Sequence, residues 1–268
     1  MKYIKLLSIL FISMVMLFSS CGKDDDQPAD EVGSVIKQYI FDNIQYQYFY
    51  TMDGKLAEYM VGLVGSLDFT SVKFEYDGDK LLNYTTYSGG EIIEKVVFIS
   101  YYENNKPAKA EVYDGDINTP DPIGSLYFTF EGDKMTRFII TELSPGQEDI
   151  IFKSEYLYSG KNVAQQKNYT YSNNNYILSR IINFTYDSNN NPAYIFNLFN
   201  FADKELFKAM SVMDINNYTS VEISDANGYV YKRQSFHKVF EYNSEGFPTD
   251  CIMTSFDNDV QYIMKYEY

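Results

Sequence analysis

Pairs of aromatic residues separated by one residue recur along this chain, and a turn-forming segment follows all but the last of them. Because side chains of a β-strand alternate between its two faces, both aromatic residues of a pair lie on the same face of a sheet. The pairs are Tyr48-Phe49-Tyr50, Phe74-Glu75-Tyr76, Phe128-Thr129-Phe130, Tyr156-Leu157-Tyr158, Tyr169-Thr170-Tyr171, Phe184-Thr185-Tyr186, Phe240-Glu241-Tyr242 and Tyr266-Glu267-Tyr268. This pattern predicts β-strands that end in turns.

The pattern is periodic. The second aromatic residues fall at Tyr50, Tyr76, Phe130, Tyr158, Tyr186, Tyr242 and Tyr268, with a weaker copy at Tyr102. Successive positions lie 26 or 28 residues apart, except for one double step of 56 residues. A period of this length indicates a repeated supersecondary unit. Further turn signals halfway through the period, at Ser88-Gly89-Gly90, Asp114-Gly115-Asp116 and Ser144-Pro145-Gly146, make each unit a hairpin of two strands.

These hairpins predict an all-β fold with a single repeat-containing domain over residues 35–268. At roughly 13 residues for each strand with its turn, the chain holds about 16 strands. An open, twisted sheet rarely exceeds about 10 strands without curling or splitting. We therefore expect the sheet to roll up as one antiparallel meander.

One segment interrupts the repeat, inside the double step. Residues 201–213 read as a short helix, because Leu206, Met210 and Met213 share a face at helical spacing and Asp203 is placed to cap it. An amphipathic helix here is either a plug over an open end of the sheet or one wall of a pocket.

The N-terminus carries a targeting signal. A basic start is followed by the apolar run Leu6 to Phe18 and by the small residues Ser19 and Ser20, which predicts a secretory signal peptide over residues 1–20. With Cys21 next, the segment resembles the lipobox of bacterial lipoproteins. That resemblance implies cleavage before Cys21, a diacylglycerol on its sulfur, and stable attachment to a membrane. The alternative is a plain secretory signal with an incidental cysteine.

An acidic segment lies directly behind the anchor. Lys23, Asp24, Asp25 and Asp26 resemble the export signal of Bacteroidetes surface lipoproteins, which implies an outer-membrane protein facing the cell exterior. The alternative is a solvated, flexible tether over residues 21–34.

The charge of the chain excludes one class of partner. Removal of the signal peptide, which contains Lys2 and Lys5 and no acid, lowers the formal charge from −15 to −17. A field of this sign repels DNA and RNA, so we expect no nucleic-acid partner.

Few residues are available for catalysis or metal binding. The chain has one histidine, His237, and one cysteine besides Cys21, namely Cys251, so the usual zinc sites are excluded. We interpret Cys251 as a small buried hydrophobic residue and His237 as a surface or packing residue of a strand. We therefore expect no enzymatic activity through these residues and no cofactor.

The carboxylate side chains raise two further hypotheses, a calcium site and a catalytic pair for glycoside hydrolysis. Asp77-Gly78-Asp79 and Asp114-Gly115-Asp116 offer oxygens to calcium, but each supplies too few, and hairpin turns explain the same residues. A carboxylate pair for glycoside hydrolysis depends on spatial pairing, and no pair stands out in the sequence.

The aromatic-turn units resemble YD-type repeats, in which a strand ends in Tyr-Asp and a Gly or Asn turn follows. The likeness is carried best by Tyr76-Asp77-Gly78-Asp79, Tyr186-Asp187-Ser188-Asn189-Asn190 and Tyr242-Asn243-Ser244-Glu245-Gly246. Together with the export signal, they make the chain similar to Bacteroidetes surface lipoproteins with degenerate repeats of this type, a class with no agreed activity. The resemblance implies a non-catalytic binding or adhesion protein, with polysaccharide as a candidate ligand. An envelope scaffold for another outer-membrane protein and an unrecognised glycoside-type hydrolase are the alternatives.

Overall fold

The computed structural model describes residues 38–190 and 216–268, apart from short gaps at residues 42, 53–55, 79, 104–105, 116–120, 133, 145–146 and 174. These residues form strands and turns. The strands are β1 (Gln38–Phe41), β2 (Ile44–Tyr50), β3 (Leu56–Leu63), β4 (Phe69–Asp77), β5 (Lys80–Ser88), β6 (Glu91–Tyr101), β7 (Pro107–Asp114), β8 (Gly124–Glu131), β9 (Lys134–Ser144), β10 (Gln147–Ser159), β11 (Asn162–Ser172), β12 (Asn175–Asn190), β13 (Asn216–Ser224), β14 (Phe236–Tyr242), β15 (Pro248–Ser255) and β16 (Gln261–Glu267).

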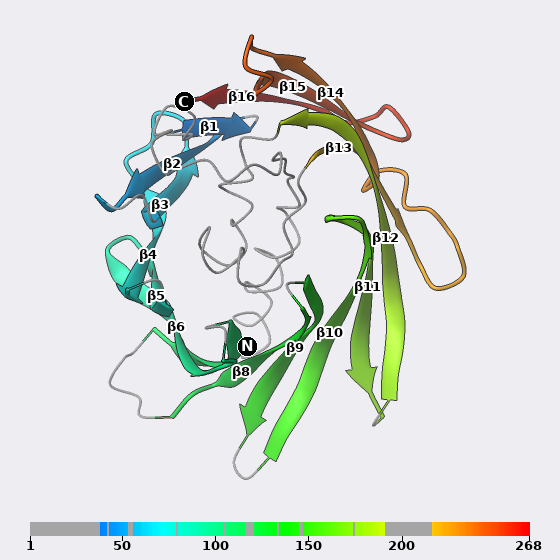
Figure 1. The fold of residues 1–268 in the computed structure, drawn as a ribbon. Helices are drawn as coiled ribbons and strands as arrows, with labels where there is room; N and C mark the ends of the chain where they lie inside the picture. The colour runs from blue at the N-terminus through cyan, green and yellow to red at the C-terminus, as the bar shows by residue number, and fades with distance from the viewer. Residues whose placement is uncertain are drawn as a thin grey trace.

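The strands form one closed, antiparallel barrel in which every strand pairs with its sequence neighbours (Figure 1). β1 closes the ring by pairing with β16, where Gln38 lies opposite Glu267. The prediction of a rolled antiparallel meander of hairpins is thereby confirmed. The predicted helix at 201–213, the signal peptide and the tether lie outside the described residues. Among the residues that the structure describes, no helix is long and apolar enough to cross a membrane.

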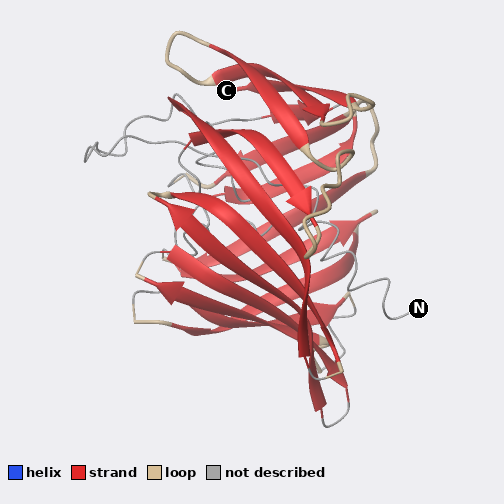
Figure 2. Ribbon diagram, turned by 90° about the vertical axis from the view of Figure 1, so that its right-hand side faces the viewer, coloured by secondary structure: helices blue, strands red, loops and turns tan. Residues whose placement is uncertain are grey.

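Burial distinguishes the two faces of the barrel wall. Along most strands, buried apolar residues alternate with half-buried or exposed polar ones. No described element covers the outside of the strands, so the buried face is the inner wall (Figure 2). Its aromatic rings contact one another from strand to strand at centroid distances of 5.4–6.4 Å. In order, they are Tyr48, Tyr59, Phe74, Tyr84, Phe98, Phe128 and Phe138.

The second aromatic residue of four pairs adds a hydrogen bond to this packing. The Tyr158 hydroxyl, near the end of β10, donates to the Met135 carbonyl near the beginning of β9, at 2.9 Å. A β-bulge between Leu157 and Tyr158 precedes the contact, and bulges increase the local twist of a strand. Equivalent bonds join Tyr76 to Leu56, Tyr101 to Leu81, Tyr186 to Val163 and Tyr268 to Pro248. We call these contacts tyrosine clamps.

One copy is shifted from the predicted position. Tyr101, not Tyr102, forms the clamp on β6, because two register shifts between Phe98 and Tyr101 turn its side chain toward the inner wall. Tyr102 is 43 % exposed, and its hydroxyl donates to the Phe128 carbonyl at 2.9 Å.

We predict that Tyr158→Phe destabilises the barrel by about 1 kcal/mol, because it removes the clamp hydrogen bond but keeps the ring. Urea denaturation of both proteins measures the difference. Tyr229→Phe is the control, since Tyr229 is 68 % exposed in a loop, and its substitution should cost less than about 0.5 kcal/mol. Equal effects of the two substitutions would contradict a structural role for the clamp.

Candidate functional site

A row of half-buried side chains crosses the outer wall from β7 to β11. Strand pairing places Lys109 opposite Tyr127, Tyr127 opposite Ile139, Ile139 opposite Lys153, and Lys153 opposite Tyr169. We call these five residues the outer belt. The row spans four strand spacings, each about 4.8 Å. It therefore offers tyrosine rings and lysine ammonium groups along one line on the barrel surface.

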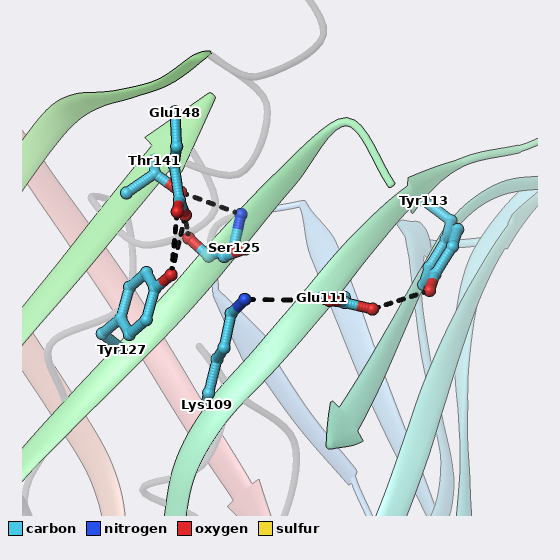
Figure 3. Close-up of polar contacts among 7 residues, drawn as sticks. All are labelled: Lys109, Glu111, Tyr113, Ser125, Tyr127, Thr141 and Glu148. Atoms are coloured by element: carbon cyan, nitrogen blue, oxygen red, sulfur yellow. Dashed lines mark hydrogen bonds and ion pairs between the residues drawn. The ribbon is translucent and has the colours of Figure 1, made fainter. Parts of the chain in front are cut away.

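At one end of the belt, hydrogen bonds fix a carboxylate beside Tyr127 (Figure 3). The Tyr127 hydroxyl donates to Glu148 at 2.8 Å, and the Thr141 hydroxyl donates to the same carboxylate at 2.6 Å. Lys109 lies with its ammonium 5.3 Å from the centre of the Tyr127 ring. Partial burial raises the pKa of Glu148, but the bonds from Thr141 and Tyr127 and the charge of Lys109 outweigh this, so its pKa is lowered. Glu148 is therefore a fixed acceptor at neutral pH.

The next strand extends this polar cluster. The Lys109 ammonium lies 3.7 Å from the Glu111 carboxylate, and the Tyr113 hydroxyl donates to the same carboxylate at 2.9 Å (Figure 3). Burial and the neighbouring Glu111 raise the pKa of the Tyr113 hydroxyl, which therefore remains a donor. The cluster thus alternates donors and acceptors over β7, β8, β9 and β10.

At the other end of the belt, Lys153 lies between two tyrosine rings. Its ammonium is 4.0 Å from the centre of the Tyr169 ring and 4.1 Å from that of Tyr176, and it contacts Glu155 at 2.7 Å. The Tyr169 hydroxyl donates to Glu155 at 2.8 Å, and burial with the charge of Glu155 raises the pKa of Tyr169 to about 12. Tyr171 packs against Tyr176 at 5.2 Å, which enlarges the aromatic surface.

Tyr169 and Tyr171 are the exception among the aromatic pairs. The other pairs supply the inner wall, whereas Lys153 and Tyr169 lie opposite one another on the outer face, because Phe152 beside Lys153 is buried inside. Tyr171 is also absent from the series of positions spaced by 26 or 28 residues. That absence is the sequence signal that distinguishes this pair.

Of the residues that the sequence singled out, Cys251 and His237 lie on β15 and β14, outside the belt. Cys21, Lys23, Asp24, Asp25 and Asp26 lie outside the described residues. Cys251 is buried in the inner wall, as predicted, and burial raises the pKa of its thiol to about 11. His237 is exposed on β14, and its ring stacks on Phe256 at 4.3 Å, which agrees with a packing residue.

The turn aspartates behave as hairpin residues. Gly78 adopts a positive φ of 57° after Asp77, and the Asp114 carboxylate accepts a hydrogen bond from the Gly115 amide. Among the described residues, no three His, Cys, Asp or Glu side chains gather as a metal site would require.

The sequence pattern did not indicate two charged residues of the inner wall, Glu94 and Lys238, whose pKa values are shifted. Glu94 on β6 lies opposite Asp114 on β7, and burial with the charge of Asp114 raises the pKa of Glu94 to about 7. The Lys238 ammonium is buried 3.9 Å from the centre of the Tyr218 ring, and burial lowers the pKa of Lys238 to about 7. Both shifts depend on neighbours that are distant in the sequence.

Comparisons with solved structures identify the fold. A porin-like protein from Bacteroides uniformis superposes with a TM-score of 0.54 at 10 % identity, covering 87 % of this chain and 96 % of that chain. The chain shares the fold of that porin-like protein. A porin-like protein from Bacteroides vulgatus gives a TM-score of 0.48 at 12 % identity, covering 87 % and 98 %.

The toxin complex TcdB2-TccC3-Cdc42 gives a TM-score of 0.34 at 9 % identity, covering 84 % of this chain and 13 % of that chain. No protein-family model matches the sequence, and no curated protein matches it. At these identities the shared property is the fold alone.

We predict that Glu94→Gln stabilises the barrel above pH 7. The raised pKa means that the folded state holds a proton that the unfolded state releases between pH 4.5 and about 7, so ionisation opposes folding as the pH rises through this range. Urea denaturation at pH 8 should show the variant to be more stable than the natural protein by about 1 kcal/mol or more. The advantage should shrink toward pH 4.5.

Glu148→Gln is the matched control, because the pKa of Glu148 is lowered. The expected change in stability has the opposite sign. Glu148→Gln should be less stable than the natural protein at neutral pH, and the difference should become smaller in acid. If both variants shift stability in the same direction at pH 8, the environment assigned to Glu94 is wrong.

Proposed function

We propose that this protein is an outer-membrane lipoprotein, anchored through Cys21, whose barrel binds polysaccharide at the cell surface without catalysing a reaction. The outer belt carries the proposal. Tyrosine rings stack on the apolar faces of sugar rings while their hydroxyl ends stay hydrated. Fixed carboxylates such as Glu148 and Glu155 accept hydrogen bonds from sugar hydroxyls.

The chemistry of the outer wall supports attachment by a lipid. Charged residues such as Lys109, Glu111, Lys153 and Glu155 occupy the middle of their strands. A barrel wall that faces lipid carries an apolar band, and lysine or arginine at the centre of that band costs about 2–4 kcal/mol. The wall is thus suited to water. The fold shared with a porin-like Bacteroides protein supports an envelope location.

A glycoside-type hydrolase is the second candidate, favoured by the facing carboxyl groups of Glu94 and Asp114. A raised pKa on one carboxyl group of a pair is what a general acid requires. Release of reducing sugar by the natural protein, and its loss in Glu94→Gln, would favour this candidate over the binding module.

The location is tested by protease treatment of intact cells. We predict that the protein is digested before lysis, while a periplasmic marker is spared. Replacing Asp24, Asp25 and Asp26 with alanine should leave the lipoprotein protected until lysis, because the export signal is removed. Protection of the natural protein on intact cells would overturn surface exposure.

Binding is tested at the Tyr169 end of the belt, where Tyr176 lies beside Lys153. We predict that Tyr169→Ala, and separately Tyr176→Ala, weakens retention on a neutral polysaccharide matrix about tenfold, the size of one lost anchor of about 1.4 kcal/mol. Affinity electrophoresis in gels that contain the polysaccharide measures the change. Tyr229→Ala, an exposed tyrosine away from the belt, should bind as the natural protein does. Equal retention of all four proteins would contradict the belt as the site.

A further inference from the structure

An apolar row crosses the outer wall of β14, β15 and β16. Strand pairing places Val239 opposite Ile252, and Ile252 opposite Ile263. These side chains are 68 %, 44 % and 53 % exposed. Other exposed apolar residues of the outer wall lie opposite polar ones, since Phe49 faces Glu58 and Leu157 faces Gln165 across their strands. The belt lies across the barrel on β7 to β11 (Figure 1). Three adjacent aliphatic side chains facing water mark an interaction surface rather than scattered exposure.

Polar side chains frame the apolar row on both sides. Toward one edge, Glu241 lies opposite Asp250, and Asp250 lies opposite Lys265. Toward the other edge, strand pairing aligns the uncharged Thr254 and Gln261 with His237. Protein–protein interfaces have this arrangement, with an apolar centre and a polar rim.

We propose that a second copy of this chain docks on this row, around a two-fold axis that runs parallel to β15 and passes through Ile252. Such an axis exchanges β14 with β16 across the contact. Val239 then faces the partner's Ile263, and Glu241 faces the partner's Lys265. Asp250 lies on the axis opposite the partner's Asp250, with Lys265 of its own sheet beside it. The apolar row and the two contacts between Glu241 and the partner's Lys265 thus repeat on both copies, as a two-fold interface requires.

The size of the patch sets the expected strength of the dimer. The apolar row and its rim comprise nine side chains, whereas a standard interface uses about 20–30 residues on each side. The isolated contact is therefore weak. Two copies held on one membrane by lipid anchors have a raised effective concentration, which favours pairing in the cell over pairing in solution.

Cross-linking in intact cells tests the proposal with the full chain. Two packed sheets lie about 10 Å apart, beyond the reach of a disulfide, so Ile252→Cys is treated with a short bismaleimide. A cysteine on the axis faces its own copy, and we expect a band of dimer mass. Leu157→Cys is the matched control, because Leu157 on β10 is 53 % exposed and lies on the outer face, as Glu155 two residues before it does. The natural protein, whose Cys251 is buried, gives the background level of cross-linking.

Equal cross-linking of the two variants, or a product of another mass from Ile252→Cys, overturns the proposal. A second set of variants tests the axis. In the Ile252→Cys background, Glu241→Lys should reduce the dimer band several-fold, and adding Lys265→Glu should restore it. Failure of the double exchange to restore the band, with unchanged melting temperatures, rejects this axis. None of these outcomes depends on polysaccharide binding.

Discussion

The tyrosine clamp is the contact on which the barrel's regularity depends. In five hairpins, a hydroxyl near the end of the second strand donates to a carbonyl near the beginning of the first, which ties the two strands together at the end opposite the turn. Lysine side chains reinforce the same positions. The ammonium groups of Lys80, Lys106 and Lys134 lie 3.9, 5.2 and 5.1 Å from the ring centres of Tyr101, Phe130 and Tyr158. At Phe130, which has no hydroxyl, Lys106 donates to the Gly132 carbonyl at 3.0 Å.

Among the described residues, strand pairing is shortest where the repeat skips a copy. The double step between Tyr186 and Tyr242 corresponds to the β13–β14 junction, where the described residues pair at two positions only. Side chains bridge the remainder of the junction. Tyr242 donates to Asp187 instead of to a carbonyl of the neighbouring strand, and Lys238 packs against Tyr218. The regular spacing of the aromatic residues thus corresponds to the well-paired strands, and the double step corresponds to the short pairing of β13 with β14.

Much of this fold could be predicted because its determinants are local. Turn signals and alternating aromatic residues specify hairpins, and the number of hairpins requires a rolled sheet. The positive φ values of Gly78, Gly89 and Gly132 confirm the predicted turns. Single-residue shifts were less predictable, since the bulges that place Tyr101 on the inner wall depend on pairing with β7. The closure of β1 on β16 is likewise a long-range event.

The candidate site could not be predicted from the same pattern, for a physical reason. The repeat constrains the inner face, where every ring must pack against the next strand, and it leaves the outer face free to vary. Lys109, Tyr127, Lys153 and Tyr169 are distant in the sequence and become neighbours only through the register of five strands. The pair Tyr169 and Tyr171 departs from the period and lies on the outer face, so inner-wall packing does not constrain it. In this barrel, the aromatic pairs that follow the repeat pack the inner wall, whereas the pair that departs from it lies on the outer face.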